Sequence, residues 1–282
     1  MIVTVLRTAM SQWSAHRTGR IGAALAYYSV FSLGPLLLIV TSIAGLFFGR
    51  DAVRGSLIAE LRSLIGNTGA QAVEAMLVGA SSEQSARSAA LVGTILLLAA
   101  ALGVVAQLKD AMNTIWNVPE SKEAGIWWYV RTYLISLAGI LGLGFLLAVS
   151  LIISAAIAAL SGTSANAMMG ELINFVASLA ILSVLFGMLF KWFPDADVDW
   201  QDVVPGAVAT ALLFNIGKFA IAWYIGTQGL ESTYGAAASI VILLIWVYYS
   251  AQIVLFGAEL THAYAITRRS AKSGSQITSA ER

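Results

Sequence analysis

The chain has 282 residues, of which 59% are hydrophobic and 11% are charged, and its formal net charge is +1. The charged share is about half that of an ordinary soluble domain, and so small a net charge gives no basis for binding nucleic acid. Because the chain has no cysteine, disulfides, thiolate metal sites and thiol nucleophiles are excluded.

Residues 1–20 are predicted to form an amphipathic helix. Apolar side chains recur there at helical spacing: Ile2, Val5, Leu6, Ala9 and Trp13. Arg7, Arg17 and Arg20 fall outside that stripe. Two placements fit the pattern: a helix in the lipid headgroup region with Trp13 at the interface, or a collar packed on the rest of the protein.

Six long apolar segments predict transmembrane helices, because about 20 apolar residues cross a hydrocarbon layer of ~30 Å. They cover about 21–48, 89–106, 133–160, 172–190, 203–225 and 236–258. Two amphipathic stripes on either side of a turn at 66–69 predict two short helices over one end of the bundle. The predicted fold class is therefore all-α: a polytopic membrane protein with a bundle of six transmembrane helices (21–262), an N-terminal amphipathic helix and a helical external loop. Residues 263–282, rich in serine and basic residues, are predicted to be a disordered cytoplasmic tail.

The distribution of Lys and Arg predicts the orientation. With the N-terminus inside, eleven of these residues are cytoplasmic and four are external, all four in the long loop at 50–88. Lys218 is left within a span. The positive-inside rule therefore favours six helices with both the N- and C-termini in the cytoplasm.

Lys218 is the most informative polar residue, because a charge within a span needs a partner or water. Asn215 lies on the same helical face, and Glu231 in the short external loop is the expected partner. The functional interpretation is an outward-facing polar site that binds an anion or relays a proton. The structural one is a snorkelling lysine or an ion pair.

Two further polar stripes are candidates for a substrate path. Tyr28 and Ser32 share a face of the first span, beside a proline that removes a backbone hydrogen bond. Tyr248, Gln252 and Glu259 share a face of the last span. Either stripe could line a route, and either could bond to neighbouring helices instead.

Glu259 is predicted near the cytoplasmic end of the last span, within reach of Lys109, Arg131 or Lys191. Such a carboxylate could carry protons in a transporter. The alternative is an ion pair that pins the bundle together.

No enzyme active site or cofactor is predicted. The acidic run at 194–202 fails as a calcium loop, since its sixth and twelfth positions hold Trp200 and Gly206. Asp199 or Asp202 as a helix N-cap explains the run. The two histidines are at opposite ends of the chain, and no hydrolase, nucleotide or zinc-protease motif accompanies them.

Four segments together resemble the YihY/BrkB family of bacterial inner-membrane proteins. They are ALAYYSVFSLGPLLL at 24–38, AMNTIWNV at 111–118, KWFPDADVDWQDVVPGA at 191–207 and YGAAASIVILLIWVYYSAQIVLFGAEL at 234–260. The resemblance implies a six-helix protein of the inner membrane with no established chemistry, for which transport is the usual suggestion. Some members carry the label ribonuclease BN, but the residues above supply no nuclease site.

The first functional hypothesis is a transporter or permease with a polar route between the first, fifth and sixth spans. Its expected partners are the lipid bilayer and a small solute or ion, and an oligomer is left open. The alternative is a non-transporting envelope scaffold that binds lipid or a protein partner. A membrane-bound hydrolase or ribonuclease is the third.

Overall fold

The computed structural model describes residues 1–81, 103–119, 167–227 and 237–280. This part of the chain is helical throughout, without a strand, as predicted for an all-α protein. Its helices are α1 (Ile2–Ala15), α2 (Thr18–Phe48), α3 (Arg50–Ser81), α6 (Ala167–Trp192), α7 (Trp200–Thr227) and α9 (Ala238–Ala280). Residues 103–115 form a further helix.

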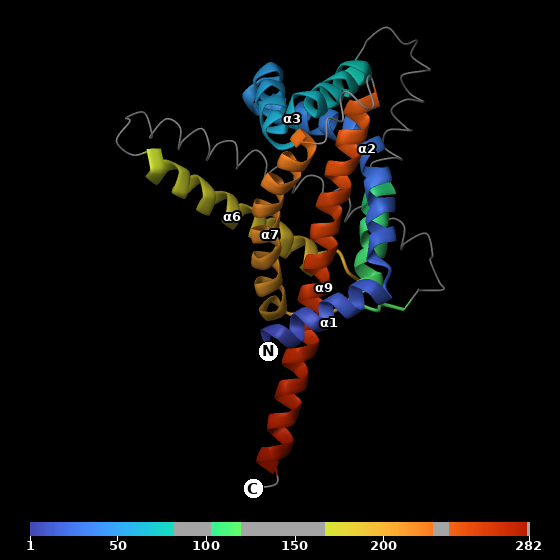
Figure 1. Ribbon diagram of the computed structural model, residues 1–282, viewed down its shortest axis with the longest axis vertical. Coiled ribbons are helices and arrows are strands. Elements are labelled where there is room, and N and C mark those ends of the chain that lie inside the picture. The colour runs from blue at the N-terminus through green and yellow to red at the C-terminus, as the bar shows by residue number, and fades with distance from the viewer. Residues whose placement is uncertain (82–102, 120–166, 228–236, 281–282) are drawn as a thin grey trace.

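The other helices are arranged around α9, which runs most of the length of the molecule (Figure 1). The helices that pack against it include α1, α2, α3 and α7. In Figure 1, α1 crosses α9 at a steep angle toward its C-terminal half, α3 lies at the opposite end, and α6 extends obliquely from α7. The arrangement follows from the sequence of α9, whose apolar residues continue around the helix and can be buried on several sides.

Three helices of the described part are long and apolar enough to cross a membrane: Phe175–Trp192, Trp200–Ile225 and Ala238–Ala271. They coincide with the predicted spans at 172–190, 203–225 and 236–258. α2 occupies the residues of the first predicted span. Most of the second (89–106) and all of the third (133–160) lie outside the described residues, so the count of six remains a prediction.

α3 differs from the two short helices that were expected, because the helix continues through the turn predicted at 66–69. The helix nevertheless doubles back on itself. Arg54 and Glu74 form an ion pair at 3.5 Å, although 20 residues of straight helix would separate them by about 30 Å. Ile58 and Val73, one from each arm, are buried in the same apolar cluster. Two helical arms that fold back on each other are thus present as predicted, although the helical backbone continues across 66–69.

α9 continues to Ala280, beyond residue 263, where the tail was predicted to begin. Ala263 and Ala265 are buried, and Arg268 forms an ion pair with Asp202 of α7 at 2.6 Å. These tertiary contacts stabilise a helix that the Ser-rich composition alone does not favour.

α7 and α9 approach each other closely at two glycines. A methyl group added at Gly206 would overlap Thr261, and one added at Gly257 would overlap Thr210. Both threonines are fully buried. Small residues spaced four apart on facing helices permit this approach of the two backbones. The crossing fixes the position of Glu259, which lies between Gly257 and Thr261 on α9.

Candidate functional site

The main candidate site is a polar cluster around Glu259, whose side chain is fully buried. Glu259 Oε1 lies 2.8 Å from His16 Nδ1 and accepts a hydrogen bond from Thr18 Oγ1 at 3.3 Å. His16 is the C-cap of α1, and Thr18 is the first residue of α2. Arg17, with φ 52°, makes the sharp turn between them. The α1–α2 turn therefore presents both partners to α9.

The second carboxylate oxygen, Glu259 Oε2, is buried without a hydrogen-bond partner among the residues that the structure describes. The same holds for four other buried polar atoms: Gln12 Oε1, Trp116 Nε1, Gln252 Oε1 and His262 Nδ1. Buried polar atoms are nearly always satisfied by protein or by ordered water. Three of the five atoms belong to α9, and Trp116 packs on His262.

His262 follows Glu259 by three residues on α9, and its ring packs against Trp116 with centroids 4.8 Å apart. The sequence placed the two histidines at opposite ends of the chain. In the folded protein both adjoin Glu259, His16 through a direct contact and His262 through the next turn of the helix.

The expected basic partners of Glu259 are engaged elsewhere in the described part of the chain. Lys109 pairs with Asp195 at 3.0 Å, and Lys191 Nζ donates to the carbonyl oxygen of Val198 at 2.5 Å. Arg131 lies outside the described residues. Within the described residues the partner of Glu259 is His16, because the left-handed turn after α1 directs it toward α9; the pairing with Arg131 stays a prediction.

Gln252 belongs to the same region as Glu259. Its Nε2 donates to the carbonyl oxygen of Gly19 at 3.4 Å, next to the α1–α2 turn. Gly22 has no side chain to exclude the Gln252 amide, which occupies the space where a Cβ would lie. The predicted stripe on the last span thus reaches this junction at Gln252 and Glu259, and the hydroxyl of the partly exposed Tyr248 lies beside Gly19.

Asn215 and Lys218 form a separate group on α7. Asn215 is buried, its Nδ2 donates to the Ala211 carbonyl at 3.0 Å, and its Oδ1 accepts from Ser178 Oγ at 3.5 Å. Lys218 is half-buried, with Nζ 5.3 Å from the centre of the Phe219 ring. The hollow beside it, lined by α7 and α9, has no room for a water molecule. Glu231, its expected partner, lies outside the described residues.

Among the described residues, no hydrogen bond or ring contact joins Tyr28 or Ser32 to the Glu259 cluster or to Asn215 and Lys218. Ser32 Oγ donates to the carbonyl oxygen of Ser29 within its own helix at 3.0 Å, and Tyr28 is exposed beside the ring of Tyr27. The eight predicted residues therefore divide into the Gln252–Glu259 region, the Asn215–Lys218 pair, these two α2 residues, Tyr248 and Glu231.

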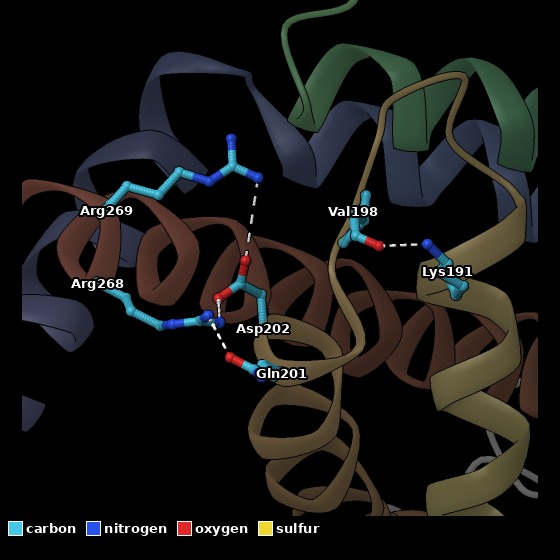
Figure 2. A network of polar contacts seen from close by, with 6 residues as sticks. All are labelled: Lys191, Val198, Gln201, Asp202, Arg268 and Arg269. Carbon is cyan, nitrogen blue, oxygen red and sulfur yellow. Dashed lines mark hydrogen bonds and ion pairs between the residues drawn. The ribbon is translucent and has the colours of Figure 1, made fainter. Parts of the chain in front are cut away.

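The acidic run at 194–202 is held by ion pairs and hydrogen bonds. α7 begins at Trp200, so Asp199 occupies the N-cap position, as one of the two predicted alternatives stated. The other, Asp202, is buried and pairs with Arg268 at 2.6 Å and Arg269 at 4.0 Å, while Gln201 also binds Arg268 (Figure 2). Within the described residues no group of three or more His, Asp or Glu could hold a metal ion.

Three of the described helices are long and apolar enough to cross a membrane. The buried Glu259 and Asp202 each face a partner side chain, as charged groups within a membrane require. Together these features define an α-helical integral membrane protein. The chain belongs to the virulence factor BrkB family, whose model matches residues 9–281. The resemblance inferred from the four sequence segments is thereby confirmed.

Three relatives illustrate the family, and each is called a UPF0761 membrane protein. The one from Stenotrophomonas maltophilia (strain K279a) is 32% identical over 253 residues, covering 87% of this chain and 57% of the relative. The one from Haemophilus influenzae (strain 86-028NP) is 27% identical over 259 residues, covering 88% and 90%. The one from Pseudoalteromonas translucida (strain TAC 125) is 30% identical over 238 residues, covering 84% and 78%.

The chain spans little more than half the length of the S. maltophilia relative. The names of these relatives state a membrane location and no enzymatic activity. No solved structure matches the chain.

Proposed function

We propose that the protein is a permease that moves a small ion or solute across the bacterial inner membrane, with the Glu259 cluster at its cytoplasmic end. The observation that carries this proposal is the buried Glu259 carboxylate, which has one oxygen on His16 and the other without a partner among the described residues. A carboxylate so placed is costly to the fold, and such residues in membrane proteins commonly mark ion or proton pathways.

The carboxylate–imidazole contact supports a role in proton transfer. An imidazole can both donate and accept a proton, and Nδ1 of His16 lies 2.8 Å from Glu259 Oε1. A proton can therefore pass between the two groups without movement of either backbone. Glu259 Oε2 provides the acceptor through which a proton, a water molecule or a solute would enter the cluster.

Lys218 and Asn215 are the proposed outer part of the same route. They lie on α7, which packs along α9, and the positive-inside orientation places them in the outer half of the membrane. The hollow at Lys218 is closed to water in this conformation. A route through both groups therefore requires α7 and α9 to separate there, as expected of a transporter that opens to one side at a time.

Flux measurements in proteoliposomes test the proposal. The wild type, Glu259→Gln and Lys218→Ala are compared using a pH-sensitive dye inside the vesicles and a panel of labelled ions and metabolites outside. Glu259→Gln is expected to reduce flux at least tenfold, since it removes the ionisable group. The matched control is Glu74→Gln, which makes the same change at a partly exposed residue of α3. Wild-type flux equal to that of empty liposomes across the panel would overturn the proposal.

A second function, a non-transporting envelope protein that binds lipid or a protein partner, is favoured by one observation. α1 leaves large apolar side chains exposed, among them Val3 and Met10. Copurification of one stoichiometric partner, together with absence of flux, would support this function over transport.

A further inference from the structure

α1 lies across the bundle and has two apolar faces. One face, formed by Val5 and Ala9, is buried against Leu260 and Ala263 of α9. Figure 1 shows the axis of α1 crossing that of α9 at a steep angle. If α9 spans the bilayer, α1 therefore lies close to parallel with the membrane surface.

The second apolar face of α1 is not covered by protein. Val3, Leu6 and Met10 follow one another at three- and four-residue spacing, and their exposed fractions are 79%, 45% and 59%. Side chains at that spacing share one side of a helix. Ser11, on another side, is also exposed. α1 thus combines a packed arc, an exposed apolar arc and a polar arc.

The level of α1 along α9 matches the boundary between acyl chains and headgroups. Trp192 and Trp200 are exposed and contact each other with ring centroids 6.2 Å apart, and tryptophan is enriched at that boundary. Arg268 of α9 pairs with Asp202 in the first turn of α7 (Figure 2), and α7 begins at Trp200. Ala263, on which α1 packs, is five residues before Arg268, or about 8 Å toward the apolar part of α9. Interfacial helices commonly lie ~5–10 Å into this region.

The charged side chains of α1 and of the start of α2 are all arginines. Arg7, Arg17 and Arg20 are exposed and have no ion pair among the described residues. The first acidic residue of the chain is Asp51, which follows α2 at the end of the molecule where α3 lies. Nothing acidic in the first 50 residues of the chain competes with an external anion for these guanidinium groups.

We propose that α1 is a membrane-surface helix that binds the anionic phospholipids of the leaflet facing it. Val3, Leu6 and Met10 enter the acyl boundary, and Arg7, Arg17 and Arg20 bind phosphate headgroups. An uncharged surface would satisfy the apolar arc but not the three arginines, whereas an anionic phospholipid surface satisfies both. Because α1 ends at His16, the lipid-bound helix also holds the imidazole beside Glu259.

The absence of cysteine permits a direct test of the α1 surface in the full chain. Leu6→Cys and the matched control Ser11→Cys are each spin-labelled in nanodiscs that contain phosphatidylglycerol and phosphatidylcholine. The label at residue 6 should be more accessible to oxygen than to a water-soluble nickel complex, and the label at residue 11 should show the reverse. Equal access of the nickel complex to both positions would overturn the proposal.

Lipid retention tests the arginines separately. The full chain is extracted from vesicles with equal amounts of the two lipids, and the retained lipids are quantified. Arg7→Gln and Arg20→Gln should each reduce the enrichment of phosphatidylglycerol by up to about fivefold, in line with the attraction of one basic residue to an anionic membrane. Arg62→Gln, on α3, removes the same charge and should leave the enrichment unchanged. A loss as large in Arg62→Gln, or none in Arg7→Gln and Arg20→Gln, would contradict anionic-lipid binding at α1.

Discussion

At the scale of single residues, the contact of His16 with Glu259 decides how much of the fold depends on the polar cluster. The two residues are 243 positions apart, and their side chains join the α1–α2 turn to the last span. Glu259 has no exposed surface, so loss of one partner leaves a buried polar group poorly satisfied.

His16→Ala is therefore expected to destabilise the protein by roughly 1–3 kcal/mol, the usual penalty for an unsatisfied buried polar group. Thermal unfolding in detergent should show a lower midpoint for this variant. Ser14→Ala, at an exposed residue of the same helix, is the control and should leave the midpoint unchanged. His16→Ala combined with Glu259→Gln should be less damaging than the two changes added together, because the second change removes the stranded charge. Additive effects would indicate that the two side chains stabilise the fold independently.

The sequence could identify Glu259 but not its partner. A carboxylate at the end of an apolar span is visible in the sequence alone. Its pairing with His16 depends on the turn at Arg17, whose left-handed conformation is unusual for a residue other than glycine. The only sequence signal for this pairing is weak: two polar residues, His16 and Thr18, flank a short break between helices.

At the scale of helices, the crossing of α7 and α9 is a specific feature of packing. Thr210 Oγ1 donates to the Gly206 carbonyl at 2.6 Å, and Thr261 Oγ1 donates to the Gly257 carbonyl at 2.8 Å. Each hydroxyl is thus satisfied within its own helix, and each threonine packs against the glycine of the other helix. Close van der Waals packing at the two glycines stabilises the crossing, and the ion pair between Arg268 and Asp202 joins the same two helices further along.

Gly206→Ala and Gly257→Ala are each expected to destabilise the protein by about 1–3 kcal/mol or more, since the added methyl group would overlap a buried threonine. Gly55→Ala is the matched control, because nothing lies within 4 Å of the added carbon on α3. Alanine favours helix over glycine by up to ~1 kcal/mol, so this control should be neutral or stabilising. Thermal unfolding of the three variants in the same detergent gives the comparison. Equal loss at Gly55 would show that helix propensity, and not close packing, determines the result.

Hydropathy predicted the helices better than it predicted how they end. The spans on α6, α7 and α9 follow from length and apolar content, which are local properties. The continuation of α9 beyond 262 depends on Asp202, which lies 66 residues before its partner Arg268. The folded-back shape of α3 likewise brings together residues distant in sequence, Ile58 and Val73, in one buried apolar cluster. Contacts between distant residues of this kind leave no periodic pattern in a single sequence.

At the scale of the whole molecule, the number of membrane crossings determines on which side each functional group lies. α1 and the α9 segment around Arg268 are at one end of the described structure, and α3 is at the other (Figure 1). α6, α7 and α9 supply three candidate crossings. If residues 14 and 270 are on the same side, the total number of crossings is even. Residues 18–166 must then contribute an odd number, which is three in the predicted six-span arrangement.

Single cysteines at Ser14, Ser270 and Arg62, all exposed, test this topology in the cysteine-free chain. A membrane-impermeant thiol reagent applied to intact inner-membrane spheroplasts is expected to label Arg62→Cys and neither of the other two. In inverted vesicles the pattern should be reversed, because the basic residues near α1 and Arg268 favour the cytoplasmic side. Denatured protein, in which all three react, provides the control for labelling efficiency.

Reaction of Ser14→Cys and Ser270→Cys from opposite sides would require an odd number of crossings. The six-span topology would then be wrong, even though α6, α7 and α9 could each still cross the membrane.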